Sequence, residues 1–359
     1  MTAGALRTPL CDLVGADVPI VQTGMGWVAG PRLVSATAAA GGLGILASAT
    51  MTLGELDKAI REVKDRTDRA FGVNLRADQD DVVERITLMG AEGVRVASFA
   101  NAPGEALVKR LKDDGLVVIP TIGAARHAEK CAAWGADAVI AQGHEGGGHT
   151  GPIPTSLLVP AVVDAVDIPV IAAGGFFDGR GLVAALAYGA AGIAMGTRFL
   201  LTRESTVPDA VKAVYLATAP TGTVVTEAID GAPQRVIRTE VIDRIARGGR
   251  VAGLPRAAWN AWRFRKLTGT TMRALLREGR AMRKGADLSW SQVAMAANAP
   301  MLTRATMVDG RLESGILPTG QVVGLIDELP TVGDVIAQIM EEARATLARL
   351  HAIDEGERT

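Results

Sequence analysis

The sequence predicts an α/β fold, and within that class a TIM (β/α)8 barrel that carries a basic helical insertion and a C-terminal helix. Three observations predict it. Short apolar runs alternate with helical patterns until eight strands have accumulated, over about 200 residues. The seventh and eighth strands both end in glycine, and a longer glycine-rich loop follows the sixth. An open doubly wound sheet is the competing architecture.

The predicted strands are short apolar runs at 19–22, 43–47, 71–75, 94–98, 117–121, 138–141, 169–173 and 192–195. Helical patterns lie between them at 33–40, 53–63, 80–89, 105–112, 124–134, 156–166 and 179–188. Gly41 and Gly42 end the first of these helices, and Asp178 is the expected N-cap of the last. Parallel strands joined in this way bring all their carboxyl ends to one end of a barrel.

The chain beyond residue 230 follows a different pattern. From Arg235 to Lys284, fourteen Lys and Arg residues oppose three acidic ones, a net charge of +11 within a chain whose total is −1. Apolar residues at helical spacing run through 256–284, and an apolar stripe from Val332 to Leu350 predicts a last helix that packs on the barrel. The expected parts are a barrel at 9–230, a basic helical lid or insertion at 231–310 and a C-terminal segment at 311–359.

Composition places the chain among globular proteins, since 48% of its 359 residues are apolar and 21% are charged. The two cysteines fit a reducing compartment better than a disulfide scaffold, and their spacing with histidine supports no metal site. We see no secretory segment and no apolar run long enough to span a membrane. A cytoplasmic protein is therefore expected.

The loop after the sixth strand is the first candidate for chemistry. It holds two of the four histidines, together with Gln142, Glu145 and five glycines. His149 is the candidate proton-transfer group because imidazole titrates near neutral pH. A glycine turn with a structural histidine is the alternative. The glycines at 174–175 and 196 predict a phosphate site, since the loops after strands seven and eight of such barrels often bind phosphate.

Five motifs in register, at 19–25, 72–75, 141–149, 169–175 and 195–199, resemble the nitronate monooxygenase family, whose near relatives include flavin-dependent enoyl-acyl-carrier-protein reductases. The resemblance implies an FMN-containing barrel with His149 beside the reactive edge of the flavin. Gly146 departs from the family, which usually has alanine there. The residues that the resemblance assigns to FMN are Met25, Asn74, Gln142, Gly147, Gly174, Gly175, Ala194, Met195, Gly196 and Thr197.

The whole sequence, including its basic insertion, resembles the actinobacterial branch linked to degradation of steroid rings. That branch is proposed to oxidise a hydroxylated, methyl-substituted hexahydroindanone carboxyl-CoA, with NAD as the other partner. A cationic lid suits the phosphates of a CoA thioester better than it suits a small nitronate. The basic segment could instead be a solvated helix pair or an oligomer contact, and nucleic acid is a weaker explanation because the rest of the chain is acidic.

The leading hypothesis is desaturation of a cyclic acyl-CoA, with His149 as the base and the flavin as hydride acceptor. Oxidation of alkyl nitronates by oxygen is the first alternative, and it gives the basic segment no use. The reverse reaction, reduction of an enoyl thioester, is the second. A non-catalytic flavin-binding or acyl-CoA-binding protein is a fourth possibility, which the joint occurrence of Gln142, His149 and two phosphate loops disfavours.

Overall fold

The structure is a computed structural model and describes residues 6–247 and 300–355. The chain forms two compact units. The first contains the described parts of Met1–Gly146, Thr150–Thr206 and Ile326–Thr359, and the second contains Gly147–His149 with the described parts of Val207–Leu325. Most of the predicted basic insertion lies outside the described residues, so the sequence-based division at residues 230 and 310 stays a prediction.

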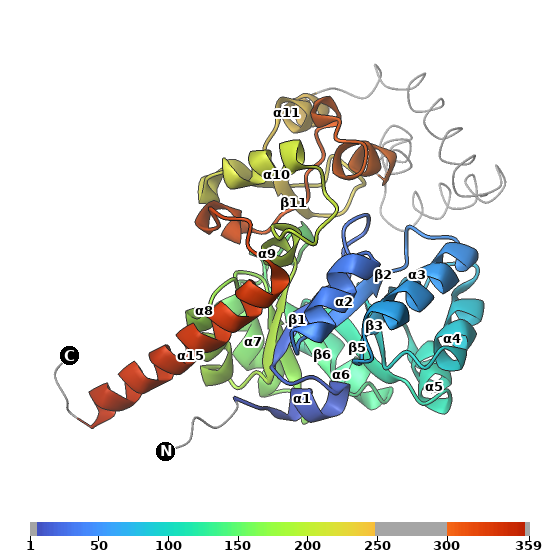
Figure 1. Cartoon of the computed structure of the whole chain (residues 1–359), viewed down its shortest axis with the longest axis vertical. Coiled ribbons are helices and arrows are strands. Elements are labelled where there is room, and N and C mark those ends of the chain that lie inside the picture. Colours follow the sequence, from blue (N-terminus) through green and yellow to red (C-terminus); the bar gives the residue numbers. More distant parts are fainter. Residues whose placement is uncertain (1–5, 248–299, 356–359) are drawn as a thin grey trace. The chain divides into compact units, whose positions relative to one another are not determined.

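The first unit is built on a closed barrel of eight parallel strands, which confirms the predicted fold (Figure 1). Ladder pairing runs between neighbours, and the last strand pairs with the first, with Val21 opposite Ala194. In barrel order the strands are β1 (Ile20–Gln22), β2 (Leu43–Ala47), β3 (Gly72–Leu75), β4 (Val96–Phe99), β5 (Val117–Ile122), β6 (Val139–Gln142), β8 (Val170–Ala173) and β9 (Gly192–Met195).

Helices follow the strands and surround the barrel (Figure 1). They are α2 (Pro31–Ala39), α3 (Leu53–Arg66), α4 (Val82–Ala91), α5 (Glu105–Asp113), α6 (Ala125–Ala133), α7 (Thr155–Val163), α8 (Gly179–Ala187) and the short α9 (Thr197–Leu200). Local sequence sets where several of them begin. Thr52 and Glu55 form a capping box at the start of α3, and the Asp178 carboxylate accepts from the Gly181 amide at the start of α8, as predicted.

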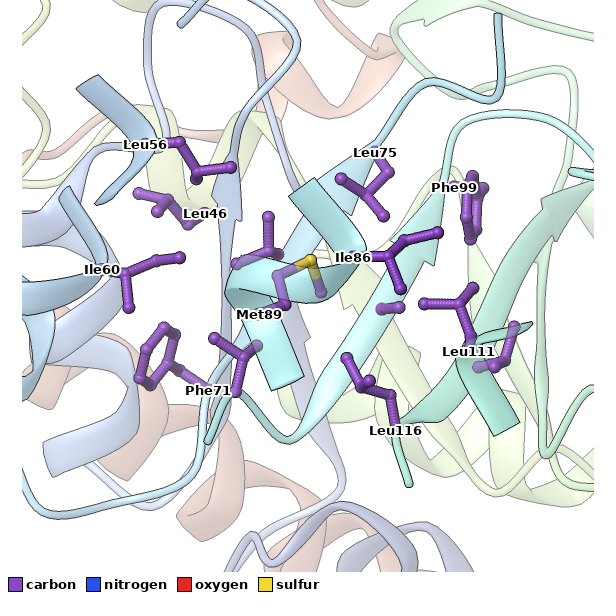
Figure 2. Packing of buried hydrophobic residues seen from close by; sticks show 14 of the residues in the cluster. Leu46, Leu56, Ile60, Phe71, Leu75, Ile86, Met89, Phe99, Leu111 and Leu116 are labelled. Atoms are coloured by element: carbon purple, nitrogen blue, oxygen red, sulfur yellow. The ribbon is translucent and has the colours of Figure 1, made fainter. Parts of the chain in front are cut away.

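Two apolar clusters hold the barrel and its helices together. One contains inward residues of the strands, such as Val21, Ile45 and Ile171, and it includes Leu10 of a further helix, α1 (Pro9–Val14). The other lies where α3, α4 and α5 pack on β2 to β5, and Figure 2 shows its Leu, Ile, Phe and Met side chains meeting between helix and strand. Burial of such side chains contributes roughly 1.5–3 kcal/mol each before entropy opposes it.

The long C-terminal helix α15 (Val332–Asp354) packs against α8 and α2. Gly179 allows the close approach, because a Cβ there would lie 2.3 Å from the Ala343 amide nitrogen. Val332 to Ala343 supply the buried stripe, as predicted. The prediction is wrong for Leu347 and Leu350, which are 41% and 44% exposed because the last turns of α15 extend beyond the helices it packs on (Figure 1).

The second unit contains a three-stranded antiparallel sheet that the sequence did not predict, in the order β10 (Thr223–Thr226), β11 (Gln234–Ile237), β7 (Gly148–His149). A small core of Ile229, Val236, Ile242 and Ile316 supports it. The unit also contains α10 (Asp209–Leu216), η1 (Pro220–Gly222), α11 (Glu240–Arg247), a helical turn at 300–307, η2 (Leu312–Ser314) and η3 (Gln321–Leu325). Its strands are too short to show an apolar period.

The helical pattern expected at 256–284 lies outside the described residues. Among the helices that the structure describes, none is long and apolar enough to cross a membrane.

Candidate functional site

The loops after β8 and β9 lie side by side at the carboxyl end of the barrel. The two strands are neighbours, with Ala173 opposite Ala194, so the glycines that follow them emerge together. Gly174 and Gly175 both have left-handed backbones, with φ of 93° and 87°. Gly196 begins α9, and Ala194, Met195 and Thr197 beside it are at most 9% exposed. Backbone amides at adjacent glycine loops and at the start of a helix are groups that can bind a phosphate.

Met25 and Asn74 reach this end of the barrel from β1 and β3. A Cβ on Gly196 would lie 3.3 Å from the Met25 sulfur, so Met25 packs beside the phosphate-type loop. A Cβ on Gly24 would lie 2.4 Å from the Asn74 Cβ, and only glycine permits this contact. The Asn74 amide donates to the Ser98 hydroxyl at 3.3 Å, which orients it. The fold thus brings Met25 and Asn74, which lie far from Gly196 in the sequence, to the same end of the barrel.

The loop after β6 folds back on Gln142. The Gly146 amide donates to the Gly143 carbonyl at 3.0 Å, and a Cβ on Gly146 would lie 2.8 Å from Gln142 Nε2. Gly174 lies against the same loop, since its Cβ would lie 3.0 Å from the Gly146 nitrogen. The loops after β6 and β8 are therefore in contact, and this contact is possible because glycine has no side chain.

Glu145 fixes these loops to each other. Its carboxylate accepts from the Thr155 amide at 2.9 Å and from the Thr155 hydroxyl at 2.7 Å, which caps the start of α7. The same hydroxyl lies 2.9 Å from the Gly174 carbonyl. His144 is similarly structural, with Nδ1 2.8 Å from the Gly151 carbonyl. The glycine loop is thus held from several sides before any ligand binds.

These residues fit FMN. Two adjacent glycine loops at the carboxyl end of the barrel can offer backbone amides to its phosphate. Glycine at 24, 146 and 174 keeps the backbone closely packed there, since added Cβ atoms would lie 3.0 Å or less from neighbouring protein atoms. Among the described residues, no group of three or more His, Cys, Asp and Glu is arranged to hold a metal ion.

Two predicted residues, Gly147 and His149, belong to the second unit. A Cβ on Gly147 would lie 2.4 Å from the Thr319 carbonyl carbon, so that backbone passes very close. His149 lies on β7, opposite Gln234 of β11. Its Nε2 is 2.8 Å from Oδ2 of Asp230, and the imidazole is 64% exposed.

Asp230 is a functional candidate that sequence reasoning missed. Burial alone would raise the pKa of its carboxyl, but the hydrogen bond and charge of His149 oppose that effect. With further donors from Ala232 and Gln234, they hold the pKa of Asp230 below its ordinary value. No local motif marks Asp230, because its partner lies 81 residues away in the chain. An Asp directly before a glycine, which is typical of a turn, was the only available signal.

Arg198 does not serve the phosphate loop. Its guanidinium is 5% exposed and donates to the Leu201 carbonyl at 2.7 Å and to the Glu328 carbonyl at 3.1 Å. Burial lowers the pKa of Arg198 against the opposing effect of Glu328 and Asp327. This arginine therefore ties α9 to the segment before α15, the structural role that is the alternative to phosphate binding.

The nitronate monooxygenase family matches residues 7–342 of the chain. The chain belongs to that family. It is 60% identical over 98% of its length, and 99% of the relative's, to the (3aS,4S,5R,7aS)-5-hydroxy-7a-methyl-1-oxo-octahydro-1H-indene-4-carboxyl-CoA dehydrogenase of Mycobacterium tuberculosis. It is 58% identical, over 97% of its length and 99% of the relative's, to the enzyme of the same name from Rhodococcus jostii.

A solved structure of FabK from Thermotoga maritima is 35% identical, with a TM-score of 0.79 over 97% of this chain and 99% of that one. As a nitronate monooxygenase family member with dehydrogenases among its relatives, the chain is an oxidoreductase. The roles of its individual site residues are not carried by these similarities and are argued below from the geometry.

Proposed function

We propose that this protein is an FMN-dependent dehydrogenase that desaturates a cyclic acyl-CoA from steroid ring degradation. The geometric observation that carries the proposal is the His149–Asp230 pair, at 2.8 Å. Desaturation next to a thioester needs a base that removes a carbon-bound proton, whereas a nitronate has already lost its proton. The 60% identity to a dehydrogenase named for an octahydroindene carboxyl-CoA supports the substrate class.

FMN, when bound, supplies the two-electron acceptor that desaturation requires. Gly174, Gly175, Gly196 and Thr197 would hold its phosphate through their backbone amides, supported by the buried Ala194 and Met195. Met25, Asn74 and Gln142 would lie along the rest of the molecule, and their contacts with Gly196, Gly24 and Gly146 at the carboxyl end of the barrel support this assignment. Gly147, which directly follows Gly146, would contact the same group through its backbone.

Asp230 determines which nitrogen of His149 acts. A carboxylate only accepts hydrogen bonds, so the proton of the neutral imidazole lies on Nε2, facing Asp230. Nδ1 is then the nitrogen with a lone pair and takes the proton from the carbon next to the thioester carbonyl. The positive charge that develops on the ring is stabilised by the carboxylate. Asp230 thus acts as a positioning residue for His149.

The CoA part of the substrate is assigned to the basic segment 235–284, of which residues 248–284 lie outside the described chain. Two described members already have partners within the second unit. Arg235 is 4% exposed and donates to the Thr223 hydroxyl, and Arg238 pairs with Asp243 at 3.0 Å. The binding cations are therefore expected among the other basic residues of the segment. NAD is the proposed electron partner, and a cytoplasmic location and assembly into a homo-oligomer remain expectations.

An anaerobic titration tests the proposal. The flavin-loaded protein is mixed with an octahydroindene carboxyl-CoA and, separately, with a simple alkyl nitronate, while the flavin absorbance is followed. Bleaching by the CoA thioester, followed by recovery on addition of NAD, is the expected result. Bleaching by the nitronate alone would instead support the oxidation of nitronates. If the purified protein binds no flavin, both reactions are excluded.

The similarity to FabK keeps the reverse reaction, reduction of an enoyl thioester, as the second candidate. The direction is distinguished by supplying NADH and the unsaturated thioester under the same conditions. The rate of NADH consumption with the unsaturated thioester is compared with the rate of NADH formation with the saturated thioester, at equal substrate concentrations. A faster rate of consumption would favour the reductase.

A further inference from the structure

Trp27 has an unusual backbone. Its φ is 65°, and among the described residues no other non-glycine residue has a positive φ. It occupies the third position of a turn that begins at Met25, where the Val28 amide donates to the Met25 carbonyl at 3.0 Å. A positive φ at that position of a turn favours glycine or asparagine, and a bulky aromatic residue there is strained.

The surrounding structure holds this turn in place. The Ala29 amide also donates to the Met25 carbonyl, at 2.9 Å, and the Ala47 amide donates to the Ala29 carbonyl at 3.0 Å. The loop is therefore bonded internally and to the end of β2. A strained residue kept in a fixed turn indicates that its side chain has a purpose, which a glycine would not serve.

Trp27 lines a cavity of about 310 Å³ within the first unit. Val28, Ala47 and Met51 supply further apolar walls, and Glu55 is the acidic residue of the lining. A cavity of this size suits a small ring system and not an extended cofactor. Because the Glu55 carboxylate carries negative charge, the cavity disfavours the phosphates of CoA and suits an uncharged group.

A buried arginine holds the segment that carries the lining residues Thr50 and Met51. Arg85 is 2% exposed and donates to the Ser48 carbonyl at 3.0 Å and to the Met51 carbonyl at 2.7 Å. Its guanidinium also pairs with the Asp81 carboxylate at 2.8 Å. The loop that carries Met51 is thus held by hydrogen bonds within the protein, which fix this part of the lining.

The cavity adjoins the residues assigned to FMN. Ala47 pairs with Asn74 across β2 and β3, and Trp27 follows Met25 by two residues. A Cβ on Gly26 would lie 3.3 Å from Thr50, another lining residue. Accepting the proposed function, the group nearest the reacting carbons is the fused ring of the acyl group. We propose that this cavity, the Trp27 pocket, binds that apolar ring with the indole against its face.

The Trp27→Gly variant tests the pocket, because glycine suits the turn and removes only the indole. Isothermal titration calorimetry on the flavin-loaded protein would compare octahydroindene carboxyl-CoA with acetyl-CoA, which shares the CoA part and lacks the ring. We expect the Kd of the ring-bearing thioester to rise about tenfold or more, the Kd of acetyl-CoA to change by less than about twofold, and Tm to stay or rise. Trp27→Phe should keep most of the affinity, and Tyr188→Ala, a half-exposed aromatic after α8, is the matched control.

Equal weakening of both thioesters would overturn the proposal, since the indole would then contact the CoA part or support the fold. The proposal would also be overturned if Trp27→Gly bound both thioesters as the wild type does, or if the wild-type protein bound the two thioesters with equal affinity. Binding is measured independently of turnover. If the protein binds the ring-bearing thioester selectively but its flavin is not bleached, the proposed function is refuted and the Trp27 pocket is supported. If the flavin is bleached but Trp27→Gly weakens the binding of both thioesters equally, the pocket is refuted and the proposed function is supported.

Discussion

The carboxyl end of the barrel and the small sheet of the second unit contribute in opposite ways. The barrel end presents backbone, since its central positions are glycines that cannot carry a side chain without collision. The small sheet presents one imidazole–carboxylate pair, His149 with Asp230, on and beside strands of two and four residues. Under the proposed function the barrel end holds the cofactor and the His149–Asp230 pair moves the proton, so substitutions in the two regions should have different effects.

The largest expected effect is on proton transfer. His149→Ala should lower turnover of the CoA thioester by about 10²- to 10⁴-fold, the range for loss of a general base, while FMN content stays that of the wild type. Steady-state kinetics and the flavin absorbance of the purified protein measure the two quantities. His351→Ala, at the exposed end of α15, is the control. Full activity in His149→Ala would remove the catalytic assignment.

A change in the barrel loops should do the opposite. Gly174→Ala places a Cβ 3.0 Å from the Gly146 nitrogen at a φ of 93°, so we expect the protein to be purified with well under one FMN per chain. Gly93→Ala is matched in strain, with φ of 71°, but its Cβ would meet nothing within 4 Å. If both variants lose flavin equally, the loss is explained by backbone strain and not by the collision in the loops after β6 and β8.

Asp230 should have an intermediate effect, because it acts through His149. Asp230→Asn should lower turnover by about tenfold to a hundredfold with FMN retained, since an amide can donate to Nε2 and so favour the wrong tautomer. The pH profile should change as well, and this change separates a positioning role from a packing role. Asp243→Asn, which breaks the Arg238 ion pair in the same unit, should leave the profile alone.

The smallest expected effect is on acid stability. The pKa of Asp230 is lowered in the folded state, so its stabilising contribution is complete above the ordinary Asp pKa of about 3.9 and is lost as pH falls through the folded value. Because the imidazole is largely exposed, we expect less than about 1 kcal/mol. Thermal unfolding of wild type and Asp230→Asn at pH 7 and pH 3 measures it. A difference between the two proteins that grows at pH 3 would contradict the assignment.

Local patterns were sufficient for the barrel. The runs at 43–47 and 192–195 were predicted with the observed bounds, and other strands shifted by a residue or two at their ends. Each strand-helix unit carries its own apolar period, and parallel connection then places all carboxyl ends together. That rule predicts that the glycine loops after the sixth, seventh and eighth strands lie at one end of the barrel, whereas Met25, Asn74 and Gln142 were assigned to the flavin through the family resemblance.

Other features depended on contacts that no local pattern carries. The stripe of α15 continues in sequence to Leu350, but burial ends at Ala343 because the neighbouring helices end there. The strained φ of Trp27 follows from hydrogen bonds at Met25 and Ala47, and composition gives no sign of it.

By itself, the sequence determined the barrel and the family, because these rest on repeated short-range patterns and motifs, whereas the residues that the resemblance assigns to FMN stay a prediction. Only the tertiary structure decided the partner of His149, the position of Glu145 as the cap of α7 and the cavity beside Trp27. Each of these needs two or more segments brought together by packing. The hydrogen bond from His149 to Asp230 spans 81 residues and lies on a sheet whose strands are too short to be recognised singly.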